Sequence, residues 1–167
     1  ADGVGVSTAG GKQLSPEITG DGAGGAIITW WDQDETDPFT PWGVFAQRID
    51  GDGASQWPSN GVQVSTDVGI TPTILPLNPL SIISDTSGGA FIAFEAVPGP
   101  RVVHINEHGM LLGPGIDGID LGEGVLTCGG PDITSDGAGG AILAWANGLK
   151  NIVAQRVTPD LILLWGT

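Results

Sequence analysis

One acidic segment, residues 31–42 of this 167-residue chain, holds the residue types best suited to binding a metal. Asp32, Asp34 and Asp37 lie there within a span of six residues. Ca²⁺ accepts several carboxylate oxygens in a flexible geometry, so this spacing predicts a calcium site formed by the three side chains. The spacing matches known calcium loops only in part, and a solvated acidic loop without a metal is the alternative interpretation.

The same segment carries the aromatic residues Trp31, Phe39 and Trp42. Aromatic faces stack on sugar rings and on partner proteins, which predicts a ligand contact at these three residues. In the alternative interpretation the rings cap the hydrophobic end of a sheet.

The sequence contains no recognisable catalytic constellation. Glycoside hydrolysis requires two carboxylates about 5 to 9.5 Å apart. With 19 Asp and Glu residues, some pair meets that condition by chance, so a glycan-active hydrolase remains only an alternative hypothesis. His104 and His108 have no Cys near them and do not predict a zinc site.

A glycine-rich turn motif recurs three times and predicts the elements that position these residues. Asp-Gly-Ala-Gly-Gly-Ala occupies residues 21–26 and 136–141, and a looser version occupies residues 85–90. Apolar runs follow the turns and end in an aromatic residue nine positions after each Asp. Such turns between short apolar runs are typical of β-hairpins. We expect the recurring Asp side chains to accept hydrogen bonds from backbone donors in the turns: Asp21, Asp85 and Asp136.

A third strand is predicted by Ala-Gln-Arg, which recurs within residues 45–49 and 153–157. A Trp, Trp57 or Trp165, follows nine residues after each Arg. The middle copy diverges, with residues 101–105 in the strand and Gly113 in place of Trp. We expect the repeated Arg residues, Arg48 and Arg156, to connect neighbouring repeats by charge-assisted hydrogen bonds.

A fourth strand is predicted at residues 62–66 of the first copy and at residues 124–127 of the middle copy. The third copy reaches residue 167 without one, and residues 2–8 read like residues 60–66. The N-terminal strand, residues 4–8, is therefore expected to complete the C-terminal repeat of the same or a neighbouring chain. The prediction is one all-β domain over residues 1–167, with repeats at about 15–66, 67–128 and 129–167 plus 1–8.

This combination resembles the blades of bacterial secreted and surface β-propellers, which carry an aspartate-glycine turn, a strand-end Trp and an Ala-Gln-Arg strand. The turns also resemble, more distantly, the Asp-boxes of sialidase propellers. The resemblance implies four-stranded propeller blades, with a strand from one terminus completing the blade at the other. Sialidases carry an arginine cluster and a tyrosine nucleophile, whereas this chain has three Arg and no Tyr. The resemblance implies fold more than activity.

The charge of the chain argues against anionic partners. Five Lys and Arg against 19 Asp and Glu give a net charge of −14, which repels nucleic acid and anionic membrane surfaces. No apolar run approaches the about 20 residues that span a bilayer. The chain starts at Ala1 and its single Met is Met110, which favours a processed protein that is secreted or held at the cell surface.

Three functional hypotheses follow. The favoured one is a non-catalytic, exported β-propeller module that acts through self-assembly and through glycan or protein binding, with Ca²⁺ as the candidate ion. The others are the hydrolase, with acidic residues in the central channel, and a structural filament subunit joined by strand exchange. Propellers typically have about four to eight blades, so three repeats favour exchange of the N-terminal strand between copies. A three-unit monomer or a fragment of a longer propeller remains open.

Overall fold

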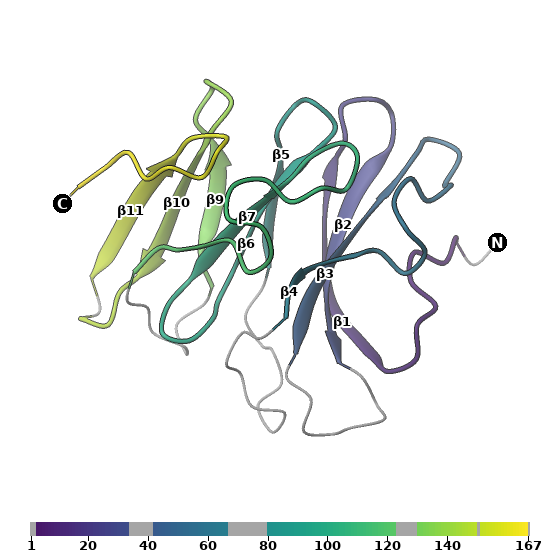
Figure 1. Cartoon of the computed structure of the whole chain (residues 1–167), viewed down its shortest axis with the longest axis horizontal. Coiled ribbons are helices and arrows are strands. Elements are labelled where there is room, and N and C mark those ends of the chain that lie inside the picture. The colour runs from purple at the N-terminus through teal and green to yellow at the C-terminus, as the bar shows by residue number, and fades with distance from the viewer. Residues whose placement is uncertain (1–2, 34–41, 67–79, 123–129, 150, 167) are drawn as a thin grey trace.

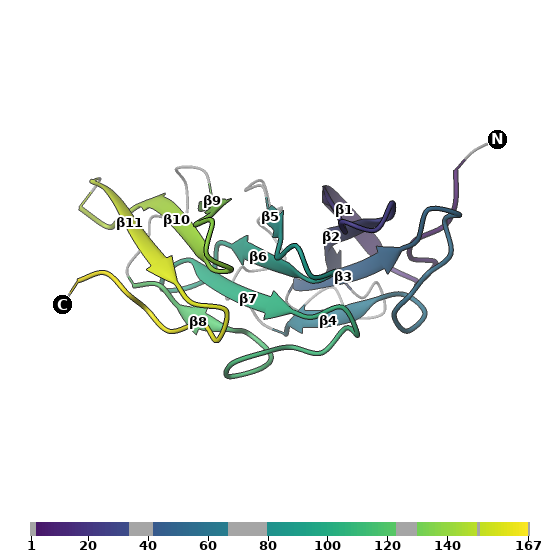
Figure 2. The same ribbon diagram turned by 90° about the horizontal axis from the view of Figure 1, so that it is seen from above.

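The computed structural model describes residues 3–33, 42–66, 80–122, 130–149 and 151–166. These residues form β-strands, turns and bends, and no helix occurs among them. The strands make three antiparallel sheets that stand side by side in a row (Figures 1 and 2). The predicted all-β class is confirmed.

The first sheet pairs its strands in chain order, β1-β2-β3-β4. Both faces of β2 carry apolar side chains: Ile27 and Trp31 pack against the second sheet, and Ile28 and Trp30 lie on the opposite face. Its register with β3 runs from Ala26 opposite Ile49 to Asp32 opposite Gly43. The bounds are β1 (Lys12–Gly20), β2 (Ala26–Gln33), β3 (Gly43–Ile49) and β4 (Val62–Ser65).

The second sheet repeats this order, as β5-β6-β7-β8. Its fourth strand contains only Ile119 and Asp120, which pair with β7. The strand predicted at residues 124–127 lies outside the described residues, and the described fourth strand of this sheet comes earlier in the chain. The bounds are β5 (Ser81–Ser84), β6 (Ala90–Phe94), β7 (Arg101–Ile105) and β8 (Ile119–Asp120).

The third sheet has three described strands in the order β11-β10-β9, so β11 is a sheet edge. Its bounds are β9 (Asp132–Ser135), β10 (Ala141–Ala146) and β11 (Ile152–Val157). The expectation that the N-terminal segment completes this sheet within one chain is wrong. The described N-terminal residues lie beside the first sheet, at the end of the row opposite to the C-terminal residues (Figure 1).

The sheets follow one pattern, which makes their positions comparable. The second strand of each begins with Ala, at Ala26, Ala90 and Ala141, and these pair with Ile49, Ile105 and Val157. An isolated β-bridge joins each of Ile49, Ile105 and Val157 to the residue six positions later in the chain. We call residues equivalent when they share a place in this pattern; Trp57, Gly113 and Trp165 are one such set. The predicted threefold repeat is thus visible in strand register.

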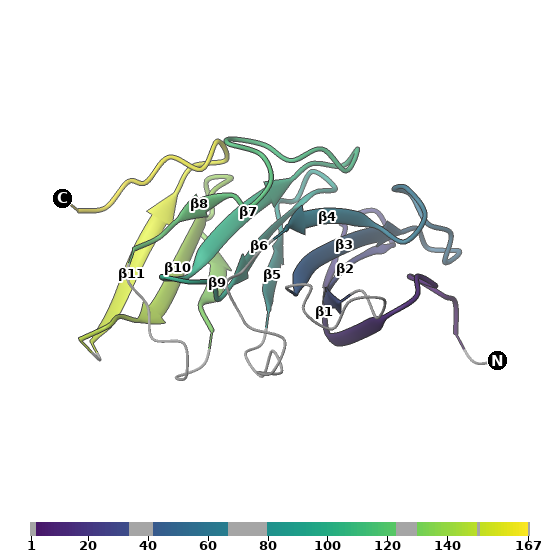
Figure 3. The same cartoon turned by 60° about the horizontal axis from the view of Figure 1, so that its bottom comes forward.

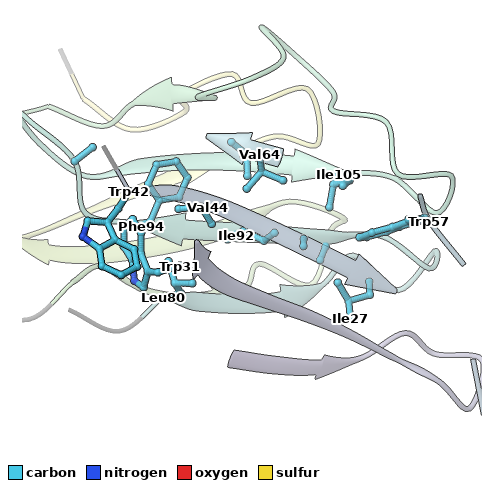
Figure 4. Close-up of a cluster of buried hydrophobic side chains, with 14 residues drawn as sticks. Ile27, Trp31, Trp42, Val44, Trp57, Val64, Leu80, Ile92, Phe94 and Ile105 are labelled. Carbon is cyan, nitrogen blue, oxygen red and sulfur yellow. The ribbon is translucent and has the colours of Figure 1, made fainter. Parts of the chain in front are cut away.

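The first strands of the sheets lie next to one another, because β1 contacts β5 and β5 contacts β9. The fourth strands β4 and β8 lie on the opposite side of the row (Figures 2 and 3). Two hydrophobic clusters fill the spaces between the sheets. One joins the first and second sheets (Figure 4), and the other joins the second and third. Each sheet therefore buries apolar side chains against its neighbour in the row.

Candidate interaction surface

The recurring Asp residues hold the hairpin turns, as the sequence predicted. One carboxylate oxygen of Asp21 accepts hydrogen bonds from the backbone N–H groups of Ala23 and Gly25, both at 2.8 Å. The other oxygen accepts from the Arg48 Nε at 2.9 Å. The bond from Ala23 is the largest influence on the pKa of Asp21, and together with Arg48 it holds that pKa below its ordinary value although burial opposes the shift.

The other two sheets repeat this arrangement. Asp136 accepts from its own turn and from the Arg156 Nε at 2.8 Å. In the second sheet His104 takes the arginine's place, with its Nε2 3.0 Å from the Asp85 carboxylate and its Nδ1 2.7 Å from the Pro159 carbonyl. The ring also stacks on Phe91. These residues therefore build turns and inter-sheet contacts.

The contact between the first and second sheets centres on Trp57. Its indole N–H donates to the Glu107 carbonyl at 3.1 Å, and Arg48 donates to the same carbonyl at 3.3 Å. The ring lies flat against Gly109, where an added Cβ would be 3.0 Å from the indole carbons. Gly109 also has a φ of 77°, so Gly is required there on both grounds. The prediction that the repeated Arg residues connect neighbouring repeats is confirmed for Arg48. The described side-chain bonds of Arg156 join it to Asp136 of its own sheet.

A second contact fixes the end of β4 to the second sheet. Asp117 accepts hydrogen bonds from the Thr66 backbone N–H and the Ser65 hydroxyl, both at 2.8 Å. Burial alone would raise the pKa of Asp117, but these hydrogen bonds and the charge of Arg101 lower it on balance. The carboxylate thus acts as a charged acceptor for a strand end on the neighbouring sheet.

The contact between the second and third sheets uses the same two positions as the first contact. The small residue now stands where the large one was, and the large one where the small one was. Gly113 replaces Trp57, and Leu161 replaces Gly109. An added Cβ at Gly113 would lie 3.3 Å from the Leu161 Cδ1. Leu161 is 4% exposed although its φ of 61° is unusual for a residue with a Cβ. The leucine fills the space that the missing indole would take.

The outer face of the third sheet, on the side away from the second sheet, carries apolar residues without a covering sheet. Ile152 is 79% exposed and Trp165 is 43% exposed. Their equivalents in the first sheet, Val44 and Trp57, are 0% and 5% exposed against the second sheet. We define this outer face by six residues: Ile142, Ala144, Ala146, Ile152, Ala154 and Trp165.

The opposite end of the row presents the face of the first sheet that no neighbouring sheet covers, which we call the free face: Pro16, Ile18, Ile28, Trp30 and Gly53. Ile28 and Trp30 are only 9% and 4% exposed in the single chain. Ile18 is 64% exposed, whereas its equivalent Ile82 packs against the first hydrophobic cluster. A pocket of about 370 Å³ lies on this face, and residues 4–7 of the N-terminal segment form part of its lining. This face is equivalent to the face of the second sheet that packs on Trp57.

The N-terminal segment contacts the first sheet as β4 contacts the second. The backbone N–H of Thr8 donates to the Asn60 side-chain oxygen at 2.9 Å. Asn60 and Asp117 are equivalent, with φ angles of 66° and 69°, and Thr8 takes the place of Thr66. The sequence match of residues 2–8 to residues 60–66 therefore has a structural counterpart at the end of the segment.

The predicted aromatic contact is changed by the structure. Trp31 and Trp42 are 0% exposed and belong to the cluster between the first two sheets (Figure 4). Neither ring has a face available for a ligand, so both are assigned to the core, in line with the alternative interpretation. Phe39 lies outside the described residues.

The predicted calcium ligands are only partly described. Asp32 accepts hydrogen bonds from Gln13 Nε2 and Trp30 Nε1, both at 3.2 Å, while Asp34 and Asp37 lie outside the described residues. Within the described ranges no group of three or more His, Cys, Asp or Glu is arranged to hold a metal. The turn at Asp50, which has a calcium-like sequence, is a hairpin turn whose carboxylate accepts from Asp52 and Ala54.

Glu95 is a buried acid that the sequence reasoning missed. It is 4% exposed, and its Oε2 has no hydrogen-bond partner. Burial raises its pKa to about 7. The equivalent of Glu95 in the first sheet is the core residue Trp31. Alignment of the two repeats could therefore have predicted that Glu95 is buried.

Comparisons with known proteins add no relative: no family model, no curated protein and no solved structure matches this chain. The part of the chain that the structure describes holds no helix of the length and apolarity needed to cross a membrane.

Proposed function

We propose that the three sheets are blades of a β-propeller and that the chain is a non-catalytic, exported module that acts through self-association. The associating surfaces are the outer face of the third sheet and the free face of the first. Within the segment 31–42, Asp32, Asp34, Asp37 and Phe39 remain the proposed contact for glycan, protein or Ca²⁺ on the strength of the sequence, without the core residues Trp31 and Trp42.

One observation carries the proposal: equivalent residues are buried between the first two sheets and exposed on the third. Val44 and Ala46 are fully buried, whereas Ile152 and Ala154 are exposed. Exposed apolar surface favours association, by roughly 25 cal/mol for each Å² removed from water. A partner that presents a surface like that of the second sheet would bury these side chains.

The chain itself presents such a surface. Ile28, Trp30 and Gly53 on the first sheet are equivalent to Ile92, Phe94 and Gly109 on the second. In a contact between copies Trp165 would lie over Gly53, as Trp57 lies over Gly109 in the single chain. Head-to-tail contact between two copies would give six sheets, within the about four to eight blades of known propellers.

The proposal is tested by charging the outer face. Ile152→Asp places a carboxylate in the contact and is expected to shift the association equilibrium at least tenfold towards single chains. The measurement is sedimentation velocity over a range of concentrations. Leu149→Asp is the matched control, because Leu149 is 78% exposed in the turn between β10 and β11 and lies off the sheet face.

Equal association of both variants and the unmodified chain would contradict the proposed surface. A circular dichroism spectrum and a melting curve for each variant verify that it remains folded.

A further inference from the structure

The repeat pattern also indicates how the two copies join. We infer that residues 4–8 of one copy form the missing fourth strand on β11 of a second copy, antiparallel, with Val4 opposite Ala154. The inference rests on the proposed self-association and specifies its geometry. The register follows from β3 and β4, where Ala46 lies opposite Val62, the equivalent of Val4.

The receiving edge is already shaped for this strand. In the first sheet Gln47 donates to the carbonyls of Trp57 and Pro58 and accepts from the Trp57 N–H, which holds the turn that leads into β4. Gln155 makes the equivalent pair of bonds to Trp165, at 2.6 and 2.8 Å. The edge and the indole beside it are therefore in place before a partner binds, which lowers the entropy lost on association.

The donated segment is likewise held near its final place. The Thr8 bond to Asn60 reproduces the Thr66 bond to Asp117, which fixes the end of β4 on the neighbouring sheet. Residues 3–8 are assigned to no strand in the single chain, so their backbone groups are free of a ladder. An unpaired strand edge binds such an extended segment through main-chain hydrogen bonds.

Apolar side chains also match across the proposed contact. In the internal contact Val44 packs in the cluster with Leu80, Ile92 and Phe94. Their equivalents on the first sheet, Pro16, Ile28 and Trp30, line the pocket of about 370 Å³. Ile152, the equivalent of Val44, would enter this pocket from the second copy. The pocket is then the unfilled half of a repeated contact.

Trp165 has a matching site as well. In the single chain the Val4 side chain rests over Gly53, where an added Cβ would lie 3.1 Å from a Val4 methyl carbon. In the internal contact this place over the glycine belongs to Trp57. When Trp165 of the second copy takes the place over Gly53, Val4 moves onto β11. Arg156 then reaches the Gly51 carbonyl, as Arg48 reaches that of Glu107.

The exchange is reciprocal because the two faces lie at opposite ends of the row (Figure 1). Each copy donates its N-terminal segment at one contact and receives a segment at the other. A head-to-tail contact of this kind closes when its rotation returns to the start. Two copies with three sheets each form a closed ring of six.

Cysteine cross-linking tests the register directly. Single variants Val4→Cys and Ala154→Cys are prepared in a Cys128→Ser background and mixed under mild oxidation. Both sites are exposed in the single chain, so the variants are expected to fold. We expect a covalent pair that contains one of each variant, identified by mass spectrometry of its linked peptides, because directly opposite residues are within reach of a disulfide.

Val4→Cys mixed with Ala144→Cys is the matched control. Ala144 lies on the same outer face, opposite Ala154 but one strand further in. It would be roughly 10 Å from Val4, two strand spacings, which is too far for a disulfide. This mixture is expected to give less than a tenth of the product.

The remaining outcomes separate the inference from the proposed function. A product from Ala154→Cys alone would show two outer faces packed symmetrically, which overturns strand exchange and leaves self-association standing. Association by sedimentation without the Val4 to Ala154 product overturns strand exchange as well. Single chains at every concentration, with no product, overturn both.

Discussion

At the scale of residues, each Asp in the repeated turns acts through two oxygens with separate tasks. One oxygen satisfies backbone donors of its own hairpin, and the other binds the Arg or His of the third strand. The sequence was enough to predict the first task, since Asp in a glycine-rich turn commonly accepts backbone hydrogen bonds. The sequence did not predict the role of His104 at the position of the arginine. In the structure its two ring nitrogens face acceptors on two different sheets.

Glu95 gives a prediction at the same scale. Its pKa of about 7 in the folded chain exceeds its ordinary value of 4.5, so the protonated acid favours folding. That contribution is complete below pH 4.5 and is lost as the pH rises through 7. Glu95→Gln keeps the shape without the charge and is expected to be more stable than the unmodified chain at pH 8, by on the order of 1 to 3 kcal/mol.

The measurement is denaturant unfolding between pH 5 and pH 8. The unmodified chain should lose more unfolding free energy between pH 5 and pH 8 than the substituted chain. Equal pH dependence of the two chains would contradict a Glu95 carboxyl whose pKa is raised by burial.

At the scale of elements, the hairpins and third strands followed from the repeated letters, whereas the middle sheet's fourth strand did not. Ile119 and Asp120 are too short a run to show a strand period. The signal that was available is the turn before them, since Asp117 and Gly118 stand where Asn60 and Gly61 precede β4. Likewise, nothing in residues 31–42 distinguishes an aromatic ring that packs between sheets from one that faces a ligand.

Substitutions of the equivalent residues Trp57 and Trp165 give two matched predictions at the scale of elements. Trp57→Ala removes a buried ring between two sheets and is expected to cost about 3 to 5 kcal/mol of unfolding free energy. Trp165→Ala removes the equivalent ring from an exposed face, so the stability of the single chain should change by less than about 1 kcal/mol while association weakens. Unfolding curves at low concentration and sedimentation at high concentration give the two quantities. An equal stability loss in both variants would show that Trp165 is a core residue of the single chain.

At the scale of the whole molecule, the two ends of the row are complementary because the repeat is nearly periodic. The free face of the first sheet resembles the face of the second sheet that packs on Trp57. The outer face of the third sheet resembles the face of the first sheet that carries Trp57. Repeat proteins need capping units that cover such faces. In this chain the end sheets keep apolar contact residues, which is the physical basis for proposing that copies cover one another.

The particle mass of the unmodified chain, measured by light scattering across a range of micromolar concentrations, shows whether copies of the chain cover one another's end sheets. A closed ring of six sheets predicts a single species at twice the 16.9 kDa of one chain, with no further growth as the concentration rises. A particle of one chain's mass at all concentrations would contradict self-association, and a mass that keeps increasing would contradict ring closure.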